Sequence, residues 1–126
     1  MRAFKTKAFA KWASAEGLDD HTLAFPVVEL NRGLVDASLG GHVVKKRVAL
    51  PGRGKRGGTR TLVAFKQRDR AFFIYGYAKN EQANVRSRAL RALKLLAKDL
   101  LNYSVPVLEK AVQTGVLIEI EVNEDG

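Results

Sequence analysis

Apolar residues in the first third of the chain recur with helical spacing. Within residues 6–16 they fall on one face, and Gly17 follows as a C-terminal stop, so this segment predicts a helix. A second helix is expected from an aspartate cap at position 19 or 20 to about Asn31. Pro26 lies inside this segment and should kink or divide the helix, because proline removes a hydrogen bond and crowds the preceding turn.

The middle of the chain has the composition of β-strands. Residues 39–41 form a predicted turn, and a hairpin is expected near residues 66–70. Three segments between and after them are rich in β-branched and aromatic residues, which predicts an antiparallel meander. The predicted strands are residues 43–50, 59–65 and 71–77.

The C-terminal third returns to helical spacing. Residues 87–101 place leucines and Ala97 in one stripe, which predicts a long amphipathic helix packed on the sheet. A short helix is expected at residues 105–113 and a final strand at 116–122, where apolar and acidic residues alternate. Together the elements predict one domain over residues 1–126 with an α+β fold: a small antiparallel β-sheet flanked by N-terminal helices and a C-terminal helix.

The charge distribution adds a functional expectation. The chain carries 22 Lys and Arg against 13 Asp and Glu, a net charge of +9. Residues 43–70 alone contain ten basic residues and one acidic residue, so this segment holds the whole excess. A basic domain of this kind commonly binds a polyanion, such as nucleic acid, the ribosome or an acidic protein.

Composition also limits the compartment and the chemistry. The chain has no cysteine, which excludes disulfides, thiolate zinc sites and a cysteine nucleophile. No stretch approaches the roughly 18 apolar residues of a membrane helix, and the first residues lack the apolar segment of a signal peptide. We therefore expect a cytoplasmic protein.

The segment 51–60 contains the candidate chemistry. It includes a GxGxxG pattern, but a dinucleotide site requires a helix after the glycines, and a strand is predicted here. A P-loop is excluded as well, because Ala49 and Arg56 stand where its first glycine and its Ser or Thr belong. Two interpretations remain: a flexible hairpin loop, or a phosphate site in which backbone N–H groups act together with Lys55, Arg56 and Arg60.

Strand alternation adds further groups to this region. Lys45 and Arg47 share one face of the first strand, and Lys46 takes the opposite face. The third strand ends near Tyr77 and Lys79, which add an aromatic ring and a cation. A basic sheet face flanked by an aromatic ring suits unpaired RNA, whose exposed bases stack on such rings.

The remaining aromatic residues are interpreted mainly as structural. Phe9 and Trp12, at helical spacing, are expected in the core or at a partner contact. Alternation places Tyr75 on the same face as Tyr77, and Phe73 on that face too, deeper in the core. For Tyr77 a half-buried structural role and a functional role both stay open.

Three runs of residues carry a family resemblance. They are Val-Lys-Lys-Arg-Val-Ala at 44–49, the loop with Gly-Lys-Arg-Gly-Gly-Thr-Arg within 52–60, and Tyr-Ala-Lys-Asn-Glu at 77–81. Together with residues 33–41 they resemble the RelE superfamily of toxins from bacterial type II toxin–antitoxin systems, in particular its HigB-like branch. The resemblance implies a small sheet flanked by helices and cleavage of mRNA in the ribosomal decoding site. It also implies neutralisation by a helix-turn-helix antitoxin encoded beside the toxin, with operator DNA bound only through that antitoxin.

The resemblance further implies a metal-independent endoribonuclease without cofactors. Such cleavage uses the RNA 2′-OH as nucleophile and needs a base, cations for the phosphorane and an acid for the 5′ oxygen. The implied catalytic residues are Arg47, Lys55, Arg60, Tyr77 and Lys79, and the implied RNA-binding residues are Lys45, Lys46, Arg53 and Arg56. Lys55 is expected as base or acid, because neighbouring cations lower the pKa of a lysine, whereas Arg47 and Arg60 stay charged and clamp the phosphate. Tyr77 either stacks on a base or donates a proton.

Some features leave alternatives open. The two histidines, His21 and His42, are expected to be exposed structural residues rather than catalytic ones. ParE-like toxins of similar architecture inhibit DNA gyrase by protein contact, and a non-catalytic RNA-binding protein would carry the same charge. The acidic tail, which includes Glu119 and Glu121, either crosses the basic face, pairs as an edge strand or contacts the antitoxin.

Overall fold

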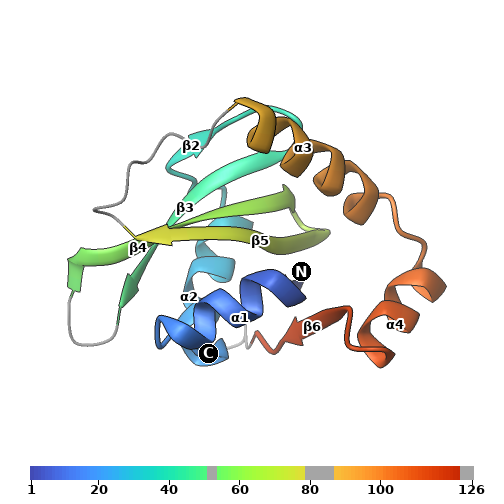
Figure 1. The fold of residues 1–126 in the computed structure, drawn as a ribbon, viewed down its shortest axis with the longest axis horizontal. Coiled ribbons are helices and arrows are strands. Elements are labelled where there is room, and N and C mark those ends of the chain that lie inside the picture. The colour runs from blue at the N-terminus through green and yellow to red at the C-terminus, as the bar shows by residue number, and fades with distance from the viewer. Residues whose placement is uncertain (51–53, 79–86, 123–126) are drawn as a thin grey trace.

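A mixed six-stranded β-sheet forms the centre of the fold, with helices packed on both of its faces (Figure 1). The computed structural model describes the backbone of residues 1–50, 54–78 and 87–122, and their side chains apart from those of residue 50 and residues 54–57. In chain order the elements are β1 (Arg2–Thr6), α1 (Lys7–Ala15), α2 (Asp20–Asn31), β2 (Ala37–Ser38), β3 (Val43–Leu50), β4 (Gly54–Lys66), β5 (Arg70–Ala78), α3 (Ser87–Leu101), α4 (Val105–Gln113) and β6 (Leu117–Ile120). Across the sheet the strand order is β2-β3-β4-β5-β1-β6.

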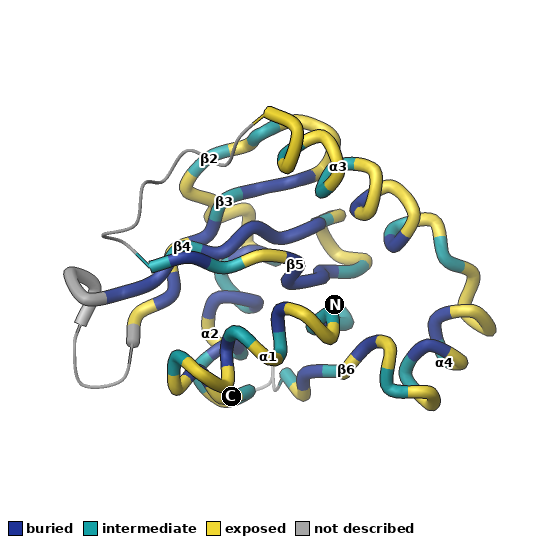
Figure 2. Tube along the Cα trace, in the orientation of Figure 1, coloured by how far each residue is buried: buried dark blue, intermediate teal, exposed yellow. Residues whose placement is uncertain are grey.

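The sheet divides the hydrophobic core into two layers. On one face α1 and α2 cover it, and Phe9, Leu23 and Phe73 are buried there. On the other face α3 and α4 contribute to a second cluster that includes Phe72 and Leu100. Figure 2 shows the central strands buried over most of their length, whereas the outer surfaces of the helices are exposed.

The predicted helices are confirmed, and their caps explain where they begin and end. The side chain of Thr6 accepts a hydrogen bond from the first turn of α1, and that of Asp19 does the same for α2. Gly17 follows α1 with φ +76°, a conformation that favours glycine. The expected division of α2 at Pro26 is wrong: the helix continues through this residue, whose side chain is buried, so that packing offsets the missing hydrogen bond. No helix in the described part of the chain is long and apolar enough to cross a membrane.

The central meander is also confirmed, but the sheet is larger than predicted. Residues Arg2–Thr6 form β1, which pairs in parallel with β5 and antiparallel with β6. Within the acidic tail, Leu117–Ile120 pairs as an edge strand, one of the three placements left open, and residues 123–126 lie outside the described part of the chain. Glu119 on β6 accepts two hydrogen bonds of 2.9 Å from the guanidinium of Arg2.

Candidate functional site

Three predicted site residues lie in one row across the sheet. Arg47 on β3 is the register partner of Arg60 on β4, and Arg60 is in turn the partner of Tyr77 on β5. Leu62, two residues after Arg60 on the same strand face, belongs to the core cluster under α3. The row therefore lies on the face of the sheet that α3 covers farther along, and directly paired residues bring their side chains into contact range.

A β-bulge determines which side chains of β5 join this row. Val63 pairs with Phe73 and Leu62 pairs with Tyr75, so that Ile74 is an extra residue on β5. The bulge reverses the alternation and turns Tyr75 and Tyr77 to the face of Arg60, with their rings 6.2 Å apart.

The expectation that Phe73 shares this face is wrong. Its ring lies 5.2 Å from that of Phe9, in the core cluster on the opposite side of the sheet. The physical reason is the same bulge, because simple alternation holds only while the register stays constant.

Arg60 and Tyr77 both present buried polar atoms without a partner. Nη1 of Arg60 and Oη of Tyr77 are shielded from solvent, and neither has a hydrogen-bond partner within the described residues. Tyr77 as a whole is only 4% exposed. Buried polar groups are normally paired, so two neighbouring donors left open indicate a place for an anionic or oxygen-rich ligand.

The third member of the row is held by its backbone. The N–H group of Arg47 donates to the carboxylate of Asp36, and the N–H group of Asp36 donates to the carbonyl of Lys45. These contacts fix β3 at the point where the two-residue strand β2 begins. The side chain of Arg47 stays exposed, and Asp36 is a positioning residue that the sequence pattern did not single out.

The two neighbouring lysines of β3 have different surroundings. Lys45 is half-buried on the same face as Arg47, as alternation predicts. Lys46 is buried on the opposite face, where its Nζ lies 3.1 Å from a carboxylate oxygen of Glu29 and donates to the carbonyl of Leu34 at 3.0 Å. The structure therefore does not bring Lys46 to the row but places it in an ion pair with Glu29 on α2, and RNA binding by Lys46 stays a prediction.

The glycine-rich segment is not the loop that its composition suggested. β4 begins at Gly54, which pairs with Leu50, so residues 54–60 are extended strand backbone rather than a cradle of N–H groups. Lys55 and Arg56 belong to this strand, but their side chains are outside the described part. Arg53 and Lys79 also lie outside the described residues.

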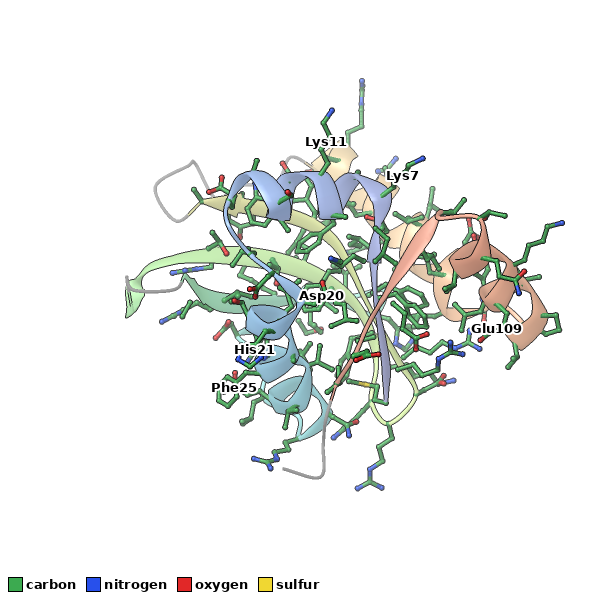
Figure 3. All side chains as sticks on the ribbon, turned by 90° about the horizontal axis from the view of Figure 1, so that it is seen from below. Lys7, Lys11, Asp20, His21, Phe25 and Glu109 are labelled. Atoms are coloured by element: carbon green, nitrogen blue, oxygen red, sulfur yellow. The ribbon has the colours of Figure 1, made fainter. Side chains whose placement is uncertain are left out.

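The histidines and acidic residues do not form a site of their own. His21 is exposed on α2 (Figure 3), which covers the face of the sheet opposite to Arg60, and His42 is exposed in the turn before β3 with φ 62°. Among the residues that the structure describes, no three His, Cys, Asp or Glu side chains are grouped as a metal site requires. The chemistry available in the row is thus that of two guanidinium groups and a phenol.

The comparison with protein families agrees with this arrangement. Residues 1–120 match the family described as RelE toxin of RelE / RelB toxin-antitoxin system. A comparison with curated proteins found no match. Because the family match spans all ten helices and strands of the described chain, this protein belongs to the RelE toxin family and is the toxin of a toxin–antitoxin pair.

Proposed function

We propose that this toxin is an endoribonuclease that cleaves mRNA and thereby inhibits translation. The observation that carries the proposal is the pair of buried, unpartnered donors on Arg60 and Tyr77, side by side on neighbouring strands. A phosphodiester offers the negative oxygens that such donors lack, and the guanidinium binds them with charge-assisted hydrogen bonds. Family membership supports the same conclusion.

The cleavage step follows from the chemistry of RNA. A base removes the proton of the 2′-OH, and the 2′ oxygen attacks the adjacent phosphorus. The P–O5′ bond breaks, the 5′ oxygen takes a proton from an acid, and the products are a 2′,3′-cyclic phosphate and a 5′-hydroxyl end. Arg60 and Arg47 stabilise the extra negative charge of the phosphorane, because arginine stays protonated and has planar, paired donors.

The proton transfers are assigned to the remaining predicted residues. Tyr77 points its hydroxyl to the same face as Arg60 and donates either to the phosphorane or to the leaving oxygen. Lys55 is the first candidate for base or acid, and Lys79 completes the site. No metal is needed in this scheme, because the cationic side chains stabilise the transition state.

The wider setting is proposed from the family resemblance. We expect the toxin to act in the cytoplasm on mRNA in the ribosomal decoding site, as a HigB-like member of its family. Its antitoxin is expected to be a helix-turn-helix protein that binds the operator DNA of the pair.

A cleavage assay with defined ends tests the proposal. The purified toxin is incubated with one mRNA, with and without programmed ribosomes, and the cut sites are mapped by primer extension. We expect cleavage with ribosomes, and a loss of at least about 100-fold in Arg60→Ala, since removing one transition-state donor has this size of effect. The matched control is Arg32→Ala, an exposed arginine after α2 whose side chain has no partner within the described chain.

Each other outcome has a defined meaning. Cleavage of naked mRNA keeps the nuclease and removes the ribosome dependence. Equal loss in Arg32→Ala would assign the effect to general charge rather than to the row. No cleavage in either condition would overturn the proposal, and inhibition of gyrase in a supercoiling assay would then support a ParE-like function.

A further inference from the structure

A second basic surface lies around the outer side of α3, away from the row of Arg47, Arg60 and Tyr77. It contains a pocket of about 500 Å³ between α3, the turn before β3 and the end of β4. The residues that line it are Gly41, His42, Lys66, Arg91, Lys94, Leu95, Lys98, Leu101 and Asn102. The proposed cleavage chemistry uses none of them.

The charge of this pocket is unbalanced. Arg91, Lys94 and Lys98 recur at three- and four-residue intervals and so share one side of α3, and Lys66 at the end of β4 faces the same space. No acidic residue lines the pocket, and none of these four cations forms an ion pair within the part of the chain that the structure describes. Like charges held this close repel one another, so an anionic partner would be stabilised here.

The same surface is also apolar. Leu95, which lines the pocket, is 62% exposed, and Leu101, which also lines it, is half-buried. Figure 2 shows the outer side of α3 as largely exposed along its length. A nucleic-acid backbone would satisfy the cations but would leave these leucines in water, whereas a peptide with both carboxylates and apolar side chains would cover both.

At one wall of the pocket, the turn before β3 packs closely against Lys94 of α3, without any partner bound. Gly40 and Gly41 have φ values of +83° and +59°, and a Cβ atom at position 41 would lie 3.0 Å from Cγ of Lys94. The glycines therefore let the turn approach α3 closely enough for the stem of Lys94 to lie against it. This packing restricts Lys94 before any partner binds, which lowers the entropy cost of binding.

We infer that this pocket, the α3 pocket, is the docking site for an acidic amphipathic segment of the antitoxin. The inference rests on the toxin–antitoxin pairing that the family match shows, and not on the RNA cleavage proposed above. Val43, which follows His42 of the α3 pocket, and Arg47 in the row are four residues apart on the extended strand β3, which corresponds to about 13 Å. The two sites are thus tested independently.

The test measures antitoxin affinity by isothermal titration calorimetry, with the full-length toxin and its purified antitoxin. In Lys94→Glu/Lys98→Glu we expect the Kd to rise at least about 30-fold, because two charges that meet carboxylates are reversed. The matched control is Lys7→Glu/Lys11→Glu, which makes the same charge change at two exposed lysines of α1 (Figure 3). Its Kd should stay within about threefold of the parent value, since long-range steering is screened by salt.

A second pair of variants tests the apolar part without any change in charge. Leu95→Ala should raise the Kd about tenfold, whereas Val105→Ala, on the equally exposed start of α4, should leave it unchanged. Circular dichroism confirms that each variant is folded. Overlapping 20-residue peptides of the antitoxin then identify the segment, which we expect to be acidic with regularly spaced apolar residues.

Three results would overturn the inference. The first is equal antitoxin affinity in the pocket variants and in their controls, and the second is a bound peptide that carries no net negative charge. A third result is that Lys94→Glu/Lys98→Glu weakens binding of a 20-nucleotide RNA but leaves antitoxin affinity intact, which would assign the pocket to nucleic acid. All of these experiments measure binding and none measures cleavage. A failure of the proposed nuclease activity would therefore leave their results unchanged.

Discussion

The indole ring of Trp12 packs directly on the backbone of Gly76, leaving no room for a Cβ atom at that position. Gly76 lies between Tyr75 and Tyr77, and the β5 bulge turns it to the face covered by α1. The contact therefore supports β5 on the face opposite to the row of Arg47, Arg60 and Tyr77. It connects the position of α1 to the orientation of the two tyrosines on the opposite face.

Gly76→Ala should destabilise the fold by about 1–3 kcal/mol, because overpacking forces the ring or the strand to move. Urea denaturation measures the loss. Trp12 is the only tryptophan in the chain, so its fluorescence reports directly on the contact. In a Trp12→Leu background the same substitution should cost less, and an unchanged cost would show that the ring is not what excludes the Cβ atom.

Tyr77→Phe separates stability from activity at the row. The variant removes a buried hydroxyl that has no partner among the described residues, so the free energy of unfolding should stay equal or rise by roughly 1 kcal/mol. Cleavage of mRNA should fall at least about tenfold, as expected for the loss of a proton donor. Tyr75→Phe, at the exposed neighbour, is the matched control. Full activity in Tyr77→Phe would restrict Tyr77 to a structural role.

Lys46→Met tests the ion pair of this lysine with Glu29. The substitution keeps the apolar stem but leaves Glu29 and the carbonyl of Leu34 without their partner, so stability should fall by about 1–3 kcal/mol. This range is below that of a fully buried pair because the Glu29 side chain is 28% exposed. Cleavage by the folded protein should be unchanged.

The control for this substitution is the adjacent residue on the other face. Lys45→Met should change stability by less than about 0.5 kcal/mol and should weaken RNA binding. The reverse pattern, with Lys46→Met impairing RNA binding at full stability, would support the prediction that Lys46 is an RNA contact.

Elements with local signals were predictable from the sequence. The cap at Asp19 and the glycine that follows α1 are short-range features, and the Asp19 side chain accepts a hydrogen bond from the first turn of α2. β1 was missed because Arg2–Thr6 gains its strand identity from pairing with β5, about 70 residues later in the chain. Nothing in five residues indicates such a partner.

The candidate site was predictable as a cluster but not in its orientation. Alternation correctly separated Lys46 from Arg47, yet the partner of Lys46 is on α2 and is known only from the fold. The bulge near Ile74 decides that Tyr77 faces Arg60, and an inserted residue of this kind leaves no mark in an apolar strand. For the same reason the prediction that Phe73 shares the face of the tyrosines was wrong, whereas the prediction that Tyr75 and Tyr77 share one face was right.

The ion pair between Arg2 and Glu119 should make stability depend on acid pH. The guanidinium donates to the carboxylate and holds the pKa of Glu119 below its ordinary value of 4.5. A carboxylate with a lowered pKa in the folded state contributes stability above its unfolded pKa, and this contribution is lost as the pH falls through the folded value. The contribution of the pair to the free energy of unfolding, about 0.5–1 kcal/mol for side chains this exposed, should therefore begin to fall near pH 4.5 and continue to fall below it.

Thermal unfolding from pH 7 to pH 3 checks this dependence in Glu119→Gln. The variant should be less stable than the parent at pH 7, and the difference should shrink below pH 4.5 because the parent carboxylate is then protonated too. Glu121→Gln is the control, since Glu121 is exposed beyond the end of β6 and has no ion partner within the described chain. A constant difference between Glu119→Gln and the parent across this range would show that the amide disturbs packing on β1 and β6 and that the charge of Glu119 contributes nothing.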